Sequence, residues 1–202
     1  PLLSPVSHMA SLSQTLDVAV LLEQRVAGYD AVVLEAKDPA ALLKWLQAHG
    51  YASRPEMENW LAPYVKAGWK ITAFKLALPE DGKTAPREGA RYAVRMSFET
   101  DRPLFPFRTP ADQSAKGPGN HLLRIFFVGG TRVRGRLGDG DWDAKVPYAR
   151  RRSDIGALLA GAVPPEAAPG TAWLTTFEDA AWPRPSEGDL YFEADGEAEV
   201  VP

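Results

Sequence analysis

Apolar residues along the chain recur with two periods, one typical of strands and one typical of helices. Residues 18–24 and 29–36 are short apolar runs rich in valine and leucine, and they predict two β-strands. Apolar positions then recur every three or four residues, which predicts amphipathic helices over residues 38–50 and 53–68. The first third of the chain therefore predicts a pair of strands followed by a pair of helices.

The ends of the two predicted helices carry their own signals. Asp38 is placed to cap the free amides of the first helix, and Pro39 suits the first helical position. Ser53 and Glu56 have the spacing of a capping box, so we expect the second helix to begin there. Pro63 falls inside the second helix and predicts a kink or a break into two short helices.

Beyond residue 68 the apolar residues alternate with polar ones, which is the pattern of half-buried strands. Residues 91–98 alternate most clearly and predict a strand. The runs 121–130 and 131–137 meet at Gly129-Gly130 and predict a β-hairpin. The remaining predictions are strands over residues 69–78, 172–177 and 189–194, an edge strand or extended loop over 102–110, and a short helix over 153–161.

These elements predict an α+β fold, in which a mainly antiparallel sheet carries the early helical pair on one face. A length of 202 residues suits one domain, which we place at residues 12–202. Residues 1–11 are interpreted as a tail or a cloning scar, because His8-Met9-Ala10-Ser11 is typical of a cloning junction.

Composition narrows the classes of function. The chain has no cysteine, which excludes a disulfide framework, a thiolate zinc site and a cysteine nucleophile. A net charge of −3 argues against nucleic-acid binding, and no run approaches the ~18 apolar residues of a membrane span. His49 and His121 are interpreted as structural residues, since three histidines offer little for a triad or a histidine-based metal site.

The stretch "LGDGDWDAK" is a candidate metal loop. Asp139, Asp141 and Asp143 alternate around a glycine and offer hard oxygen ligands, which suit calcium. The loop is no EF-hand, because its sixth position is Ala144 and its twelfth is Arg150. The alternative is a polar turn whose aspartates hydrogen-bond their own backbone. We expect no other cofactor.

Arginines gather on the predicted hairpin and form a candidate ligand-binding surface. Arg132, Arg134 and Arg136 fall on one face of a strand, with Arg124 on the preceding strand. Trp142, beside the aspartates, is the tryptophan that we expect to be exposed. Guanidinium groups in this arrangement suit a phosphate, sulfate or carboxylate ligand. The alternative is a solvated sheet face whose arginines pair with acidic residues elsewhere.

Three internal stretches and the C-terminal stretch resemble one bacterial family. They read "YDAVVLEAKDPAALLKWLQAHGY", "LAPYVKAGWKITAFKLAL", "MSFETDRPLFPFRTP" and "AWLTTFEDAAWPRPSEGDLYFEAD", and they are similar to the domain-of-unknown-function family 2330. The resemblance implies an exported or envelope-associated protein and no particular reaction. Typical members carry an N-terminal half with a cysteine-bearing segment, so this chain resembles their C-terminal half.

The residues and the resemblance together predict a non-enzymatic binding or structural module of the bacterial envelope or exterior. Its ligand is expected to be acidic and to meet the arginines of the predicted hairpin. One alternative is a hydrolase whose carboxylates converge from distant parts of the chain. The other is a half-domain that packs on a partner domain or on a second copy, which predicts an exposed apolar patch.

Overall fold

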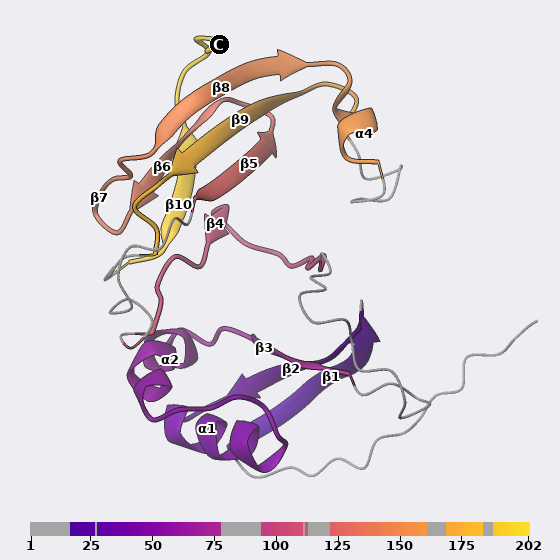
Figure 1. Cartoon of the computed structure of the whole chain (residues 1–202), viewed down its shortest axis with the longest axis vertical. Helices are drawn as coiled ribbons and strands as arrows, with labels where there is room; N and C mark the ends of the chain where they lie inside the picture. Colours follow the sequence, from indigo (N-terminus) through magenta and orange to yellow (C-terminus); the bar gives the residue numbers. More distant parts are fainter. Residues whose placement is uncertain are drawn as a thin grey trace, which may run out of the picture. The chain divides into compact units, whose positions relative to one another are not determined.

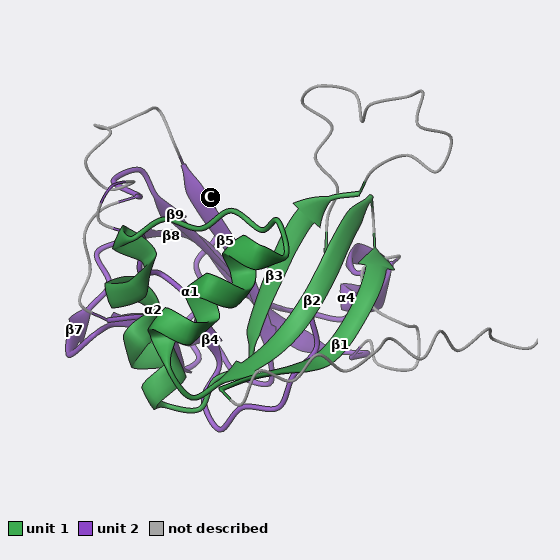
Figure 2. Ribbon diagram, turned by 90° about the horizontal axis from the view of Figure 1, so that it is seen from below, with its two compact units in different colours: residues 1–94 green, residues 95–202 purple. Residues whose placement is uncertain are grey.

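The computed structural model describes residues 17–26, 28–77, 94–110, 112, 122–160, 169–183 and 188–202. The chain divides into two compact units, unit 1 with residues 1–94 and unit 2 with residues 95–202 (Figure 2). The assignment of residues 12–202 to one domain stays a prediction. Within the described residues, no helix has both the length and the apolar character needed to cross a membrane.

Unit 1 is an antiparallel sheet covered by two helices. Its elements are β1 (Val18–Val26), β2 (Tyr29–Ala36), α1 (Pro39–Ala48), α2 (Glu56–Lys66) and β3 (Ile71–Leu76). The strand order is β1-β2-β3, and every pair is antiparallel. Figure 2 shows both helices lying across one face of this sheet. The predicted pair of strands and pair of helices are confirmed.

The helix ends follow the sequence in α1 and depart from it in α2. The Asp38 carboxylate accepts a hydrogen bond from the Ala41 amide at 2.7 Å, with Pro39 in the first turn. The predicted capping box is wrong, because α2 begins at Glu56, and Pro55 at its N-cap supplies no side-chain hydrogen bond. Pro63 lies inside α2, which runs as one helix from Glu56 to Lys66.

His49 closes the first helix. Its Nδ1 lies 2.7 Å from the carbonyl oxygen of Trp45, and this oxygen accepts the hydrogen bond. The imidazole stacks on the Trp45 ring at 3.8 Å between centroids. The next residue, Gly50, has a φ of 72°, which a glycine adopts without strain. His49 therefore has the structural position that the sequence predicts, while His121 lies outside the described residues.

Unit 2 contains two antiparallel sheets (Figure 1). One sheet has the order β4-β10-β6-β7 and the other the order β5-β9-β8. The unit also has a short helix, α4. The bounds are β4 (Leu104–Phe105), β5 (Leu123–Gly129), β6 (Val133–Leu137), β7 (Gly140–Asp141), β8 (Lys145–Arg152), α4 (Ile155–Leu158), β9 (Ala172–Asp179) and β10 (Leu190–Ala194).

Aromatic rings from both sheets form the core of unit 2. Phe192 of β10 packs against Phe127 of β5 at 4.9 Å and against Phe177 of β9 at 5.6 Å between ring centroids. Leu190 and Phe107 are fully buried in the same cluster. Each sheet therefore has one face toward this core and one outer face.

The β-hairpin predicted at Gly129-Gly130 is wrong. β5 pairs with β9, whereas β6 pairs with β10 and β7, so the two glycines connect strands of different sheets. Both strands alternate apolar and polar residues, and alternation shows which face is buried but not which strand is the neighbour. The apolar faces of β5 and β6 meet across the core instead of lying side by side.

A second expectation fails at residues 91–98. Residues 94–98 are irregular, and Met96 and Phe98 are 60% and 64% exposed, although their alternation predicts a strand. Residues 91–93 lie outside the described part of the chain. The other strands and the short helix predicted in unit 2 are present. They include an edge strand within residues 102–110, where β4 pairs with β10. The fold is α+β and mainly antiparallel, as predicted.

Candidate functional site

The candidate arginines lie on two different sheets. Arg134 and Arg136 occupy alternate positions in β6, and Arg132 immediately precedes this strand. We call these three residues the arginine row. Arg124 belongs to β5 in the other sheet, where it lies opposite Glu178. Since β5 and β6 form no hairpin, Arg124 is not part of the same surface as the arginine row.

Acidic partners hold two members of the arginine row. The Arg132 guanidinium lies 3.1 Å from the Asp195 carboxylate and donates to the Ala198 carbonyl at 2.7 Å. Arg136 donates to the Asp141 carboxylate at 2.5 Å and to the Asp139 carbonyl at 2.9 Å. Both guanidinium groups are therefore engaged by the fold. This matches the structural alternative for these two residues.

Arg124 is engaged as well. Its Nε and Nη2 donate to the Glu178 carboxylate across the strand pair at 2.8 and 2.6 Å. Opposite charges facing each other on neighbouring strands stabilise a sheet by a few tenths of a kcal/mol to ~1 kcal/mol. The geometry assigns Arg124 to sheet pairing.

Arg134 is held more loosely than its neighbours. Its Nη2 lies 3.6 Å from the Glu193 carboxylate, and the same carboxylate accepts a hydrogen bond from Arg102 at 3.1 Å. The Arg134 side chain is 51% exposed. Because Glu193 is shared with a closer cation, the Arg134 guanidinium retains donors for another anion.

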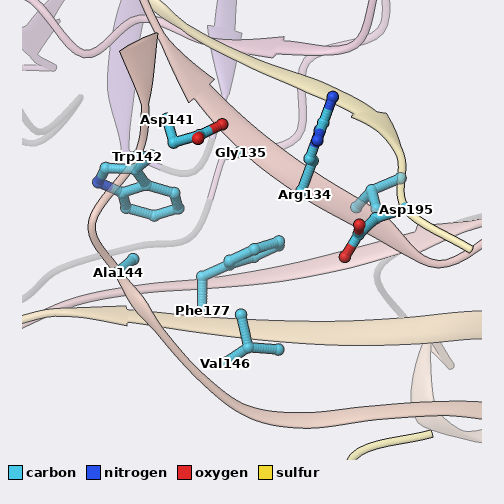
Figure 3. A pocket seen from close by; sticks show the side chains of 9 residues that line it. Arg134, Gly135, Asp141, Trp142, Ala144, Val146, Phe177 and Asp195 are labelled. Atoms are coloured by element: carbon cyan, nitrogen blue, oxygen red, sulfur yellow. The ribbon is translucent and has the colours of Figure 1, made fainter. Parts of the chain in front are cut away.

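A hollow lies beside Arg134, and we call it the β6 hollow (Figure 3). Of β6, only Arg136 and Leu137 pair with β7. The hollow lies beside the part of β6 that does not pair with β7. The buried Trp142 and Phe177 form its apolar floor, and charged residues form its rim. The Arg134 side chain extends from this rim to the side of β6 away from Phe177, as Figure 3 shows. The lining residues are Val133, Arg134, Gly135, Asp141, Trp142, Ala144, Val146, Phe177 and Asp195.

Trp142 is buried, so the prediction that it is exposed is wrong. Its indole Nε1 donates to the Asp179 carboxylate at 2.8 Å, and its ring packs at 5.3 Å from Phe177. Gly135 makes room for it, since a Cβ on Gly135 would lie 2.6 Å from the Trp142 ring. Trp142 still belongs to the site as part of its floor. Its neighbours in sequence are polar, and a buried partner such as Asp179 leaves no local signal.

Asp179 and Asp189 are buried carboxylates that sequence reasoning did not single out. Asp179 accepts from Trp142 and from the Ala181 amide at 2.8 Å. Asp189 accepts from the Phe107 amide at 3.0 Å. Both carboxylates hold distant segments of unit 2 together. Neither belongs to the lining of the β6 hollow.

The aspartate loop forms the turn around β7. The Asp141 carboxylate is taken by Arg136, and Asp139 contributes its backbone carbonyl to the same guanidinium. Among the described residues, no group of three or more histidines, aspartates or glutamates is placed to hold a metal ion. The geometry is that of a polar turn closed by an arginine. The calcium site over Asp139, Asp141 and Asp143 stays a prediction.

Two carboxylates line the β6 hollow, and each has a basic partner. Asp141 pairs with Arg136, and Asp195 pairs with Arg132. A glycoside hydrolase commonly uses two carboxyl groups as acid and as base or nucleophile, and here each carboxylate instead forms an ion pair with an arginine. The chemistry available at this rim is charge pairing and hydrogen bonding.

Comparison with known proteins gives one match. No curated protein and no solved structure matches the chain. The model of the family described as "Uncharacterized protein conserved in bacteria (DUF2330)" matches residues 5–192. The resemblance seen in the sequence thus extends over nearly the whole chain, and the chain belongs to the DUF2330 family of bacterial proteins.

Proposed function

We propose that the protein is a non-enzymatic binding module whose β6 hollow takes a ligand bearing a carboxylate. The ligand anion meets the Arg134 guanidinium on the outer side of β6, and an apolar part of the ligand passes the stretch of β6 not paired with β7 and contacts the floor formed by Trp142 and Phe177. The observation that carries this proposal is the loose, shared pairing of an exposed arginine beside an apolar hollow. Small-ligand sites commonly combine an apolar lining with a few polar groups.

The charges of the rim support a single anionic group on the ligand. Asp141 and Asp195 repel further negative charge, while Arg132 and Arg136 are occupied by them. A ligand with one carboxylate near an apolar moiety fits this pattern better than a dense polyanion does. The two carboxylates at the rim likewise give no support to nucleic acid as a partner.

The expectation of an exported or envelope location stays a proposal that rests on the family resemblance. The hydrolase alternative finds no support in the rim, because each of its carboxylates is paired with an arginine. We therefore infer binding rather than catalysis as the role of this hollow.

The proposal is tested with a defined probe, phenylbutyrate, which joins one carboxylate to an apolar group. We expect saturable binding by calorimetry, and the uncharged phenylbutyramide as a matched control should bind weakly. Arg134→Ala removes a charge-assisted hydrogen bond of about 1.5–3 kcal/mol and should weaken binding roughly 10- to 100-fold.

Arg124→Ala serves as the control variant, because it removes the same side chain from the other sheet. We expect it to leave the affinity unchanged. Arg134→Lys should give an intermediate affinity, since lysine keeps the charge and loses the forked geometry. Equal affinities for the wild type and Arg134→Ala, or no binding of either probe, would overturn the proposal.

A further inference from the structure

One strand of unit 2 has an open edge. In the order β5-β9-β8, β5 has a strand partner on one side only among the residues that the structure describes (Figure 1). Each residue of Leu123–Gly129 is at least partly exposed, whereas most of β9 is buried. The sequence of this edge, LRIFFVG, is apolar except for Arg124. The edge therefore presents unpaired backbone groups beside apolar side chains.

The other outer strand of the same sheet is protected. In β8 the register with β9 shifts between Lys145 and Tyr148, and Pro147 lies within this shift. The C-terminal segment also covers β8, since Ala149 and Val200 exchange two backbone hydrogen bonds of 2.8 Å. A bulge, a proline and a covering segment are common means of blocking edge pairing.

Among the residues that the structure describes, β5 has none of these devices. Its seven residues contain no proline and no lysine, and their register with β9 runs without a shift. Phe126 lies in the middle of the strand with 62% of its surface exposed. A long, regular and apolar edge of this kind is a site for pairing with another strand.

We propose that β5 pairs with β5 of a second copy of the chain in an antiparallel, two-fold arrangement centred on Phe126. The β5-β9-β8 sheets of the two copies then form one continuous sheet across the dimer. A two-fold axis uses the same surface on both copies, which is the commonest form of self-association. The inference is independent of the proposed ligand site, because β5 contributes no residue to the β6 hollow.

The register of this pairing suits both faces of the sheet. Centring on Phe126 places the two Phe126 rings opposite each other on the outer face. Ile125 then lies opposite Phe127 of the partner on the inner face, where both already pack against the core. Arg124 lies opposite Val128, so like charges do not meet. Opposed aromatic residues on neighbouring strands add to sheet stability.

A cysteine placed at the centre tests the arrangement. The chain has no cysteine, so Phe126→Cys introduces a single thiol. Directly opposed residues on antiparallel strands have Cα atoms about 4.5–5.5 Å apart, within disulfide range. We expect mild oxidation to produce a covalent dimer. Leu158→Cys, at an exposed position of α4, is the matched control and should remain monomeric on a denaturing gel.

A charge at the same position tests the pairing without covalent chemistry. In sedimentation equilibrium the wild type should dimerise with increasing concentration. Phe126→Lys, which would bring two ammonium groups together, should abolish the dimer, while Leu158→Lys should leave it intact. Circular dichroism confirms that both variants are folded. A wild type that stays monomeric, or cross-linking of Phe126→Cys no faster than of the control, would overturn the inference.

Discussion

The two units differ in how their cores are filled and in how far apart in sequence the contacting residues lie. In unit 1 the buried residues Val32, Leu34 and Leu42 belong to neighbouring elements, and a helix pair covers the sheet. In unit 2 rings such as Phe127 and Phe192 meet between two sheets. A gap of about 10 Å between packed sheets suits long aromatic side chains. Unit 1 therefore has more local order, since β1 pairs with the next strand, although β2 also pairs with the distant β3. Unit 2 depends mainly on pairing between distant strands.

The largest expected effects come from truncating each core separately. Phe177→Ala in unit 2 removes a ring that is 2% exposed and should cost about 3–5 kcal/mol, and Leu42→Ala in unit 1 about 2–5 kcal/mol. Since each unit has its own core, we expect each variant to lower the unfolding free energy of its own unit. Hydrogen exchange read by mass spectrometry reports the two units separately. Loss of protection in both units from either variant would break the comparison.

A smaller effect is expected where Gly135 makes room for the buried Trp142 ring in unit 2. Gly135→Ala would place a Cβ 2.6 Å from the Trp142 ring, and the resulting overpacking should cost about 1–3 kcal/mol. Gly130→Ala is the control, because a Cβ there meets no atom within 4 Å. Urea denaturation measures both variants. Equal midpoints for the two would show that Trp142 moves without cost.

The same difference explains which features were predictable from sequence. The strands β1 and β2, the Asp38 cap and the structural role of His49 involve residues close together in the chain, and all were predicted. The false hairpin at Gly129-Gly130 failed because β5 and β6 find their partners at β9 and β10, about 50 residues further on.

At the candidate site the sequence predicted residue types better than partners. The alternation of Arg132, Arg134 and Arg136 was recognised, but their pairing with Asp195, Glu193 and Asp141 was not. The distances from the guanidinium groups to these carboxylates show that, within the arginine row, Arg134 is the loosely held residue. The burial of Trp142 was missed for the same reason, since its partner Asp179 is 37 residues away. Local patterns carry no record of such contacts.

Two substitutions in unit 1 test the capping residues predicted at the N-termini of α1 and α2. Asp38→Ala removes the hydrogen bond to the Ala41 amide and should cost about 1 kcal/mol. Ser53→Ala should have almost no effect, because α2 is not capped by a side chain. Both are measured by thermal unfolding of unit 1. A larger loss for Ser53→Ala than for Asp38→Ala would contradict the helix boundaries described above.

The smallest effect is expected for a local contact in unit 2, the ion pair between Arg152 and Asp154. The Arg152 guanidinium donates to the Asp154 carboxylate and lowers the pKa of that carboxyl below its usual value. Because the pKa is lowered in the folded state, the pairing favours folding above the ordinary aspartate pKa. This contribution is lost as the pH falls through the lowered value. Both groups face solvent, so water and salt screen the pair.

An NMR titration of the Asp154 carboxyl carbon checks this last prediction directly. Arg152→Ala should return the pKa of Asp154 to its ordinary range, whereas Arg150→Ala, whose partner is Glu199, should leave it lowered. Neither variant should shift the urea midpoint detectably, because exposed pairs contribute little. Arg152 also donates to the Tyr148 hydroxyl, so a clear loss of stability in Arg152→Ala would mean that contacts between residues two and four apart support unit 2. The contrast between a locally ordered unit 1 and a unit 2 held by distant pairs would then no longer apply.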